Sequence, residues 1–249
     1  MTVALAVLTG AAGRARAVPN AAGTLPPARP ATGRIEGTVE ISSTLAARRA
    51  PIRIYADPGS GSTPPASPRD PIAAELKNVV VYLDGDGEHL PASPSRIESH
   101  RHGSIAQRDE RFAPHVVAVM QGGKVEFPNE DDVFHNVYSL SSGSTFDLGR
   151  YPKGSSRAAT FNRVATVTVF CHIHQDMSAV VLVLSNPFFA SPGDDHKFVI
   201  DDVPEGDYTV VGWHERIKTP ITWRVHVTAG QATVVDFNIP LPQGGRVPR

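Results

Sequence analysis

Hydrophobic and polar residues alternate with a period of two along several short segments of this chain. The clearest segments are residues 35–39, 79–83, 124–127, 165–170, 198–200, 208–211 and 233–239. Such alternation places one face of a strand in a core and the other in solvent. Gly, Asp and Pro turns separate the segments, and no window of about 12 residues has the periodicity of an amphipathic helix. The pattern predicts an all-β fold of short strands arranged in sandwiches.

The N-terminal residues predict export. The apolar run MTVALAVLTGAAG is followed by RARAV, in which Ala15 and Ala17 have the small-x-small spacing that signal peptidase accepts. We therefore expect a signal peptide and a periplasmic or otherwise exported protein. The longest apolar stretch elsewhere, residues 179–184, is far shorter than a transmembrane helix, so no integral membrane segment is expected in the mature protein.

Composition narrows the function classes. The chain has 249 residues, enough for one large domain or two small ones. With 24 Lys and Arg against 25 Asp and Glu, the net charge is -1 and no overall field attracts nucleic acid. The single cysteine, Cys171, excludes an intrachain disulfide and any multi-cysteine metal cluster. Phosphate-binding glycine loops, nucleophile elbows and H-E-x-x-H helices are absent from the sequence, so no familiar enzyme class is favoured.

The segment around Cys171 carries the strongest chemical signal. In VATVTVFCHIHQDM the alternation places Cys171 at the end of a strand, on its core-facing side. The pattern then breaks into a loop with the spacing C-x-x-H-x-x-M, which brings in His174 and Met177. A thiolate, two imidazoles and a thioether are the ligands that suit copper cycling between Cu(I) and Cu(II). His135, just after the strand at 124–127, is the best candidate for the second imidazole.

These motifs resemble a known family. FPN at 127–129, HNV at 135–137 and C-x-x-H-x-x-M at 171–177 are similar to the blue-copper cupredoxins with the short ligand loop of the amicyanin type. FDLGRY at 146–151 and SNPFFA at 185–190 resemble exported plastocyanin-like proteins that are often labelled methylamine-utilisation proteins. The resemblance implies a Greek-key cupredoxin sandwich with one type 1 copper ion.

The resemblance also implies a role for each motif residue. The implied copper ligands are His135, Cys171 and His174 in the equatorial plane and Met177 as the weak axial ligand. Asn136 is implied as the residue that ties the two ligand loops together and tunes the cysteine sulfur through hydrogen bonds. His172 departs from the family pattern; the alternation turns its side chain away from the cysteine, which favours a surface or packing role.

Ordinary structural roles are the alternative explanation for these residues. A lone strand cysteine is usually a small buried hydrophobe, and a methionine beside it usually fills a core. Only the order and spacing of the four residues together favour a metal, and copper is favoured over zinc because a thioether adds little for zinc. The acidic run 130–132 is predicted to be a solvated turn, and His115 an edge histidine. For His214, beside Trp213 and Glu215, packing and a surface hydrogen bond are predicted, because no nucleophile can be placed next to it.

A second module follows the copper segment. HKFVIDDVPEGDYTVVGWHE and VTAGQATVVDFNIP resemble the last strands of carboxypeptidase-regulatory-like β-sandwiches. The first run is interpreted as a hairpin with its turn at 204–207 and with Phe198 and Ile200 facing inward. Segments 33–42 and 78–85, on the other side of the copper segment, supply the opening strands. The cupredoxin is therefore predicted to be inserted in a discontinuous second β-sandwich.

This organisation gives the following expected boundaries: signal peptide 1–17, linker 18–32, first part of the second sandwich 33–98 with a disordered loop at 57–71, copper domain 99–190, second part of the second sandwich 191–243, and tail 244–249.

The predicted function is one-electron transfer between periplasmic redox partners, such as a c-type cytochrome or a periplasmic dehydrogenase, and not catalysis. By resemblance, the exposed edge of His174 is the electron port, and partners dock there weakly. The alternative is a copper carrier, storage or interaction protein without an electron-transfer role. A domain of a multicopper oxidase or nitrite reductase would need further histidine clusters, and the H-x-H pairs of this sequence are His100 with His102 and His172 with His174.

Overall fold

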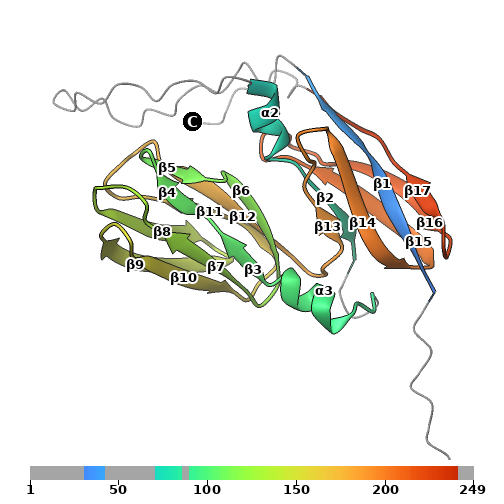
Figure 1. Cartoon of the computed structure of the whole chain (residues 1–249), viewed down its shortest axis with the longest axis horizontal. Coiled ribbons are helices and arrows are strands. Elements are labelled where there is room, and N and C mark those ends of the chain that lie inside the picture. Colours follow the sequence, from blue (N-terminus) through green and yellow to red (C-terminus); the bar gives the residue numbers. More distant parts are fainter. Residues whose placement is uncertain (1–30, 43–70, 86–89, 241–249) are drawn as a thin grey trace, which may run out of the picture.

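A computed structural model describes residues 31–42, 71–85 and 90–240 (Figure 1). The expected signal peptide at 1–17, the tail at 244–249, and nearly all of the linker at 18–32 and of the loop at 57–71 lie outside the described residues. Strands dominate the described residues, and two helices of six residues each, α2 (Pro71–Leu76) and α3 (Pro94–Ser99), accompany them there, which confirms the all-β prediction. In the described ranges, no helix combines the length and the apolar character needed to cross a bilayer.

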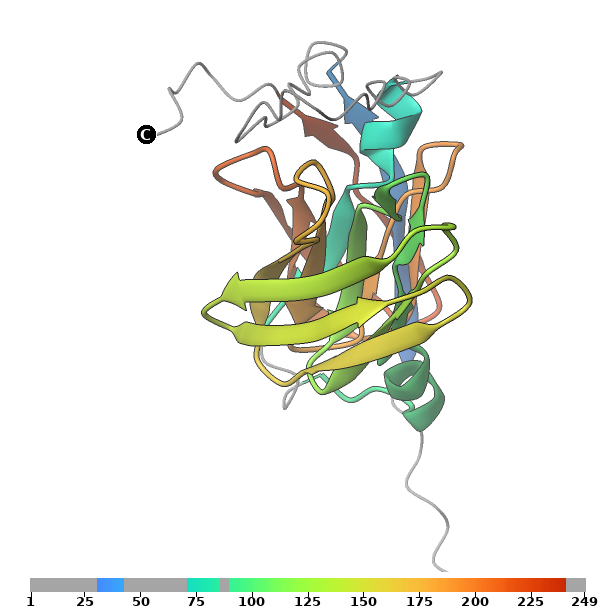
Figure 2. The ribbon, with the colours of Figure 1, turned by 90° about the vertical axis from the view of Figure 1, so that its left-hand side faces the viewer.

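The first sandwich consists of a five-stranded sheet, β6-β12-β11-β8-β9, and a three-stranded sheet, β10-β7-β3 (Figure 2). Its strands are β3 (His102–Ser104), β6 (Val116–Met120), β7 (Gly123–Pro128), β8 (His135–Ser141), β9 (Ser144–Tyr151), β10 (Ser156–Phe161), β11 (Ala165–Phe170) and β12 (Ser178–Leu184), with a small hairpin of β4 (Ala106–Arg108) and β5 (Arg111–Ala113). Its core includes Phe127, Phe161, Val167 and Val169, which are fully buried. The last two are the positions that the alternation assigns to the inner face of β11.

The second sandwich is built from both flanks of the first. One sheet has the order β14-β1-β17, with β18 also paired to β1, and the other has the order β13-β2-β15-β16. The strands are β1 (Thr32–Ile41), β2 (Val80–Asp84), β13 (Phe189–Ala190), β14 (Lys197–Pro204), β15 (Gly206–Trp213), β16 (Ile221–Val227), β17 (Ala232–Val234) and β18 (Phe237–Ile239). Because β1 lies between β14 and β17, the chain must pass through the first sandwich before this sheet is complete (Figure 1). The predicted insertion of one sandwich in the other is confirmed.

The predicted hairpin at 204–207 is wrong. β14 pairs with β1, whereas β15 pairs with β2 and β16, so the chain crosses from one sheet to the other at this turn. Phe198 and Ile200 do face the core, as expected, and meet Val210 of β15 in the same hydrophobic cluster. Alternation identifies which face of a strand is buried, but it does not identify the partner strand, because two strands can also face one core from opposite sheets.

The apolar stretch at 179–184 forms a strand that is buried on both faces. Val181 and Val183 of β12 face the core of the first sandwich. Val180, Leu182 and Leu184 belong to a separate cluster that includes Val80 of β2 and is flanked by Trp213 of β15. Burial on two sides removes the polar half of the alternation, as it does in central strands of covered sheets. This cluster joins the two sandwiches.

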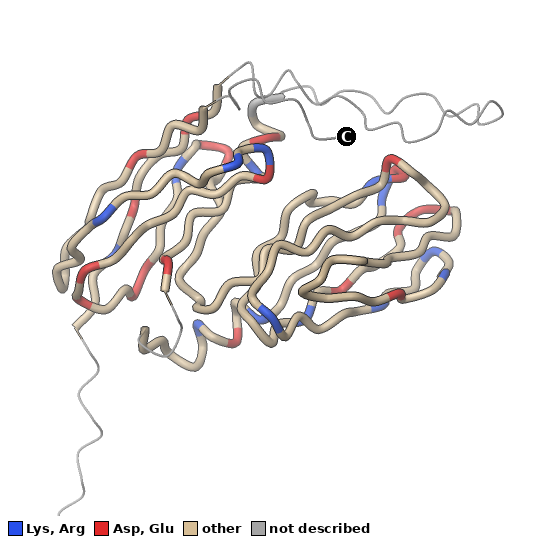
Figure 3. The backbone as a smooth tube through the Cα atoms, turned by 180° about the vertical axis from the view of Figure 1, so that it is seen from behind, with Lys and Arg blue, Asp and Glu red and all other residues tan. Residues whose placement is uncertain are grey.

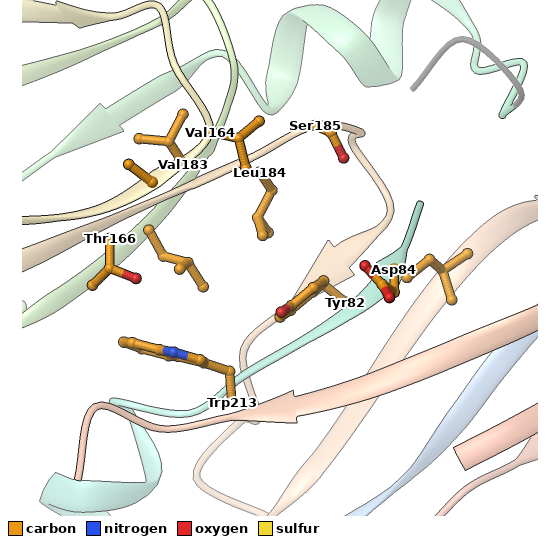
Figure 4. Close-up of a pocket in the computed structure, with 11 residues that line it drawn as sticks. Tyr82, Asp84, Val164, Thr166, Val183, Leu184, Ser185 and Trp213 are labelled. Atoms are coloured by element: carbon orange, nitrogen blue, oxygen red, sulfur yellow. The ribbon is translucent and has the colours of Figure 1, made fainter. Parts of the chain in front are cut away.

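A cavity of about 220 Å³ lies beside the contact between the two sandwiches, which we call the seam (Figure 4). Tyr82 and Trp213 line it from the second sandwich, and Val164, Thr166 and Leu184 line it from the first. The seam therefore combines close apolar contact along β12 with an incompletely filled space beside the two aromatic rings.

Candidate metal centre

Three of the predicted ligand residues lie together at one end of the first sandwich. His135 begins β8, Cys171 follows the last residue of β11, and His174 lies in the loop between β11 and β12. The two Nδ1 atoms are 3.0 Å apart, and each is 3.9 Å from the Sγ of Cys171. Metal-nitrogen bonds of about 2.0 Å and metal-sulfur bonds of about 2.3 Å fit a triangle of this size. The donor set fits one metal ion with a preference for soft and borderline ligands.

Met177 returns the loop to the core beside the cysteine. Its backbone N–H donates to the carbonyl of His174 at 3.1 Å, and the backbone N–H of Cys171 donates to the carbonyl of Met177 at 3.3 Å. Its side chain is buried in the same hydrophobic cluster as Cys171. The two backbone bonds close residues 171–177 into a compact turn, which keeps the thioether and the thiol in one short loop.

Burial favours the form of His174 that binds metal. His135 is fully buried and Cys171 is 4% exposed. Burial, followed by the proximity of His135, lowers the pKa of His174, although the carboxylates of Glu110 and Asp131 act in the opposite direction. An imidazole must be neutral to ligate a metal, so the lowered pKa widens the pH range in which His174 is available.

Asn136 links the two segments that carry the histidines and the cysteine. Its Oδ1 accepts a hydrogen bond of 3.1 Å from the backbone N–H of His172, next to Cys171. Its Nδ2 donates to Oδ1 of Asp147 at 2.6 Å, and the residue is almost fully buried. The amide thus spans from the start of β8 to the end of β11, which is the contact expected of a residue that ties the two ligand loops together.

Asp131 is a site residue that the sequence did not reveal. The interpretation of 130–132 as a solvated turn is wrong at this position, because Oδ2 of Asp131 lies 2.7 Å from Nε2 of His135 and its side chain is only 13% exposed. Burial would raise the pKa of the Asp131 carboxyl, but hydrogen bonds from the backbone of Glu110, from His135 and from the backbone of Asp109 bring the pKa below its ordinary value. A carboxylate on Nε2 leaves Nδ1 of His135 as the nitrogen that faces Cys171 and His174.

Replacement of Asp131 with asparagine is expected to weaken metal binding by about 10- to 100-fold, because the carboxylate that orients His135 through Nε2 is lost. Competition with a chelator of known affinity measures this effect. Asp132→Asn is the matched control, since its carboxylate is 90% exposed and pairs with Lys153 at 2.7 Å instead of with a histidine of the site. Equal affinities of the two variants would contradict the role given to Asp131.

The other histidines of the described ranges lie outside this cluster. The ring of His172 stacks on Tyr138, with centroids 3.7 Å apart and an interplanar angle of 3°, so it faces away from the cysteine as the alternation predicts. His102 pairs with Glu98 at 2.9 Å on the surface. His214 is fully buried, so the surface hydrogen bond predicted for it is wrong, because its Nε2 lies 3.2 Å from a carboxylate oxygen of the buried Glu75.

Apolar side chains and paired charges surround the cluster. Phe134 precedes His135 and is 57% exposed, and Ile173 precedes His174 and is 38% exposed. Near the site, Arg108 pairs with Glu130, the residue before Asp131. Acidic and basic residues are interspersed over both sandwiches of the described chain (Figure 3). The surface at the site is therefore apolar at its centre and mixed in charge around it.

Comparisons with known proteins give partial matches to solved structures. No protein-family model matches the chain, and no curated protein matches it. Among solved structures, a purple cupredoxin from Nitrosopumilus maritimus matches at 19% identity, over 33% of this chain and 99% of that protein, with a TM-score of 0.31. Amicyanin from Paracoccus versutus matches at 19% identity, over 42% of this chain and 97% of that protein, with a TM-score of 0.32.

A copper-containing nitrite reductase from Thermus scotoductus SA-01 also matches, at 23% identity and with a TM-score of 0.31. This match covers 32% of the present chain and only 22% of the enzyme. Scores of this size carry no argument about the site, so the fold assignment rests on the strand order and pairing described above. These three matches each leave more than half of the chain uncovered.

Proposed function

We propose that this protein is an exported mononuclear type 1 copper protein that carries one electron at a time between redox partners. The observation that carries the proposal is the triangle of two imidazole nitrogens and one thiol sulfur beside the start of β8 and the end of β11, in which His135 and Cys171 are buried and His174 is partly buried. Met177 in the same loop adds a thioether, which distinguishes this donor set from those of structural zinc sites. Copper supplies reversible one-electron exchange when bound.

The proposed ligands have separate tasks. His135, Cys171 and His174 are the equatorial ligands, and Met177 is the weak axial ligand. Asn136 and Asp131 orient the ligands through the hydrogen bonds described above. His135 and Cys171 are fixed where strands enter the core, so the chain holds their side chains with little freedom to move between oxidation states. This restraint favours electron transfer over substrate chemistry.

The proposed electron port is the exposed edge of His174. Phe134 and Ile173, which precede the two proposed ligand histidines, present apolar surface, and Arg108 pairs with Glu130 nearby. Such a surface suits a small, transient interface with another redox protein, for which a c-type cytochrome or a periplasmic dehydrogenase is proposed. We further propose that the copper domain begins at residue 99 and ends with β12 (Ser178–Leu184). The described parts of 33–98 and of 185–243 then form the second sandwich, because Phe188 lies in its core and β13 (Phe189–Ala190), expected in the copper domain, pairs with β2.

The test is a titration of the purified protein with Cu(II), followed by absorption and EPR spectroscopy. One equivalent is expected to give an intense visible charge-transfer band that reductant bleaches and oxidant restores over repeated cycles. Tight Cu(I) binding without reversible cycling would instead identify a copper carrier or storage protein. Failure to bind copper at all would refute the metal centre.

A further inference from the structure

His115 connects the metal-binding loop to the rest of the molecule. Its ring Nδ1 lies 3.0 Å from the carbonyl oxygen of Ser178, the residue that follows Met177. Its backbone carbonyl accepts a hydrogen bond of 2.7 Å from the N–H of Val180. Side chain and backbone of one residue therefore both hold the first residues of β12, where the loop that carries Met177 ends.

The other nitrogen of this ring meets the second sandwich. Nε2 of His115 lies 2.8 Å from Oε1 of Glu215, and both side chains are largely shielded from solvent, with 20% and 23% of their surface exposed. Glu215 follows β15, so this pair spans the boundary between the two sandwiches. The edge histidine predicted from the sequence is thus a bridge between a ligand loop and a different folding core.

The segment that carries Glu215 is fixed on both sides. His214 before it is fully buried against Glu75, and Nη1 of Arg216 after it lies 2.9 Å from the other carboxylate oxygen of Glu75. The backbone N–H of Arg216 also donates to Nδ1 of His214 at 3.1 Å. Because His214 and Arg216 fix the backbone on both sides of Glu215, the Glu215 side chain must move together with the second sandwich.

The apolar seam brings the same two regions together. Val116, next to His115, and Val180, two residues after Ser178, belong to the buried cluster that joins the sandwiches. The contact between His115 and Glu215 therefore lies where close packing already sets the distance between β6, β12 and the second sandwich. The imidazole ring of His115 contacts both Glu215 and the carbonyl of Ser178, so a displacement of the second sandwich would also displace that carbonyl.

We infer that the second sandwich positions the metal-binding loop through the His115–Glu215 pair, so that metal binding and the stability of the second sandwich are coupled. His115 and Glu215 act as positioning residues, and neither is placed among the ligands. This inference rests on the proposed function only in so far as residues 171–177 bind a metal. The inference assigns a role to the second sandwich, which is to position the loop at 171–177.

Tryptophan fluorescence reports on the second sandwich and, through Trp213, on its contact with the first. The chain has two tryptophans, and both lie there, Trp213 in β15 and Trp223 in β16. Urea unfolding of the full-length wild type, followed by tryptophan emission with and without one equivalent of Cu(I), should show a higher midpoint with metal. Glu215→Gln is expected to reduce this metal-induced shift by at least half.

Asp207→Asn is the matched control, because Asp207 also pairs with a histidine at 2.8 Å, but on the exposed surface of the second sandwich. It should retain the full shift. An equal shift in wild type and Glu215→Gln would overturn the inference, and so would the absence of any shift in wild type that binds the metal. Repetition with Zn(II), which the same thiol and imidazoles ligate, keeps this outcome separate from a failure of the type 1 copper proposal.

The reduction potential of the bound copper is the second measurement. It should not change if His115 and Glu215 only stabilise the fold. Glu215→Gln and His115→Gln are each expected to change the ratio of Cu(I) to Cu(II) affinity by threefold or more, which is about 28 mV at 59 mV per tenfold change. The double variant should show the change of one single variant, because both substitutions break the same link. Unchanged potentials in both single variants, with normal spectra, would show that the pair does not position the loop.

Discussion

Cys171→Ser is expected to abolish the intense visible band of the copper-loaded protein. The band arises from charge transfer between a thiolate and copper, and a serine hydroxyl is a hard, neutral donor at neutral pH. Because the substitution removes a direct ligand, copper affinity should fall by more than the roughly 10- to 100-fold typical of outer hydrogen-bonding partners. Absorption and EPR spectra at one equivalent of Cu(II) check the first effect, and chelator competition checks the second.

The same substitution should leave the fold intact. Cys171 is buried beside Val169, and the exchange of sulfur for oxygen leaves no large cavity. Burial of a hydroxyl costs about 1–3 kcal/mol where no partner is found, which lowers the unfolding midpoint without preventing folding. Far-UV circular dichroism and thermal unfolding of the metal-free protein separate ligand loss from misfolding.

His172→Ala provides the matched spectroscopic control. His172 is directly adjacent to Cys171, but its ring stacks on Tyr138 outside the ligand cluster. The visible band should therefore survive this change. A band that persists in Cys171→Ser, or disappears in His172→Ala, would show that the ligand set is assigned incorrectly.

The loop that carries Cys171, His174 and Met177 could be predicted from the sequence because its information is local. Cys171, His174 and Met177 lie within seven residues, and the alternation of β11 determines on which side the cysteine points. Asn136 and His135 are also consecutive, so one strand start places both. Local spacing and strand period are properties that a sequence displays directly.

Long-range pairing is where the prediction failed. β14 and β15 are consecutive and show the expected alternation. Yet β14 pairs with β1 and β15 pairs with β2, and both of these partner strands precede the first sandwich in the sequence. His115 and Glu215 lie one hundred positions apart, and no pattern around either of them identifies the other. Asp131 is an intermediate case. The four-residue spacing to His135 was visible, but a turn of three acidic residues is usually solvated, and only the fold shows which of the three faces inward.

Glu75→Ala is expected to destabilise the second sandwich by about 3 kcal/mol. Glu75 is almost fully buried and its two carboxylate oxygens face His214 and Arg216, while Asn78 donates to it at 3.2 Å. Removal of one partner from a buried ion pair typically costs about 3–5 kcal/mol, since the remaining charge loses its compensation. The lower end applies here because the Arg216 side chain keeps 17% of its surface exposed. Alanine is also the best helix former, so α2 itself is not weakened.

Urea unfolding followed by tryptophan emission measures this effect, and Asp194→Ala is the control for it. Asp194 pairs with Lys77 at 3.2 Å, and their side chains are 80% and 60% exposed, so its removal should change stability by no more than about 0.5 kcal/mol. Equal losses in the two variants would mean that Arg216 and His214 find other partners or water. A large loss of stability in Glu75→Ala alone would show that the contacts of Glu75 with His214 and Arg216 hold the turn that carries Glu215. The metal-induced shift in tryptophan-monitored unfolding should then weaken in this variant as well, because the turn would no longer hold Glu215 in place against His115.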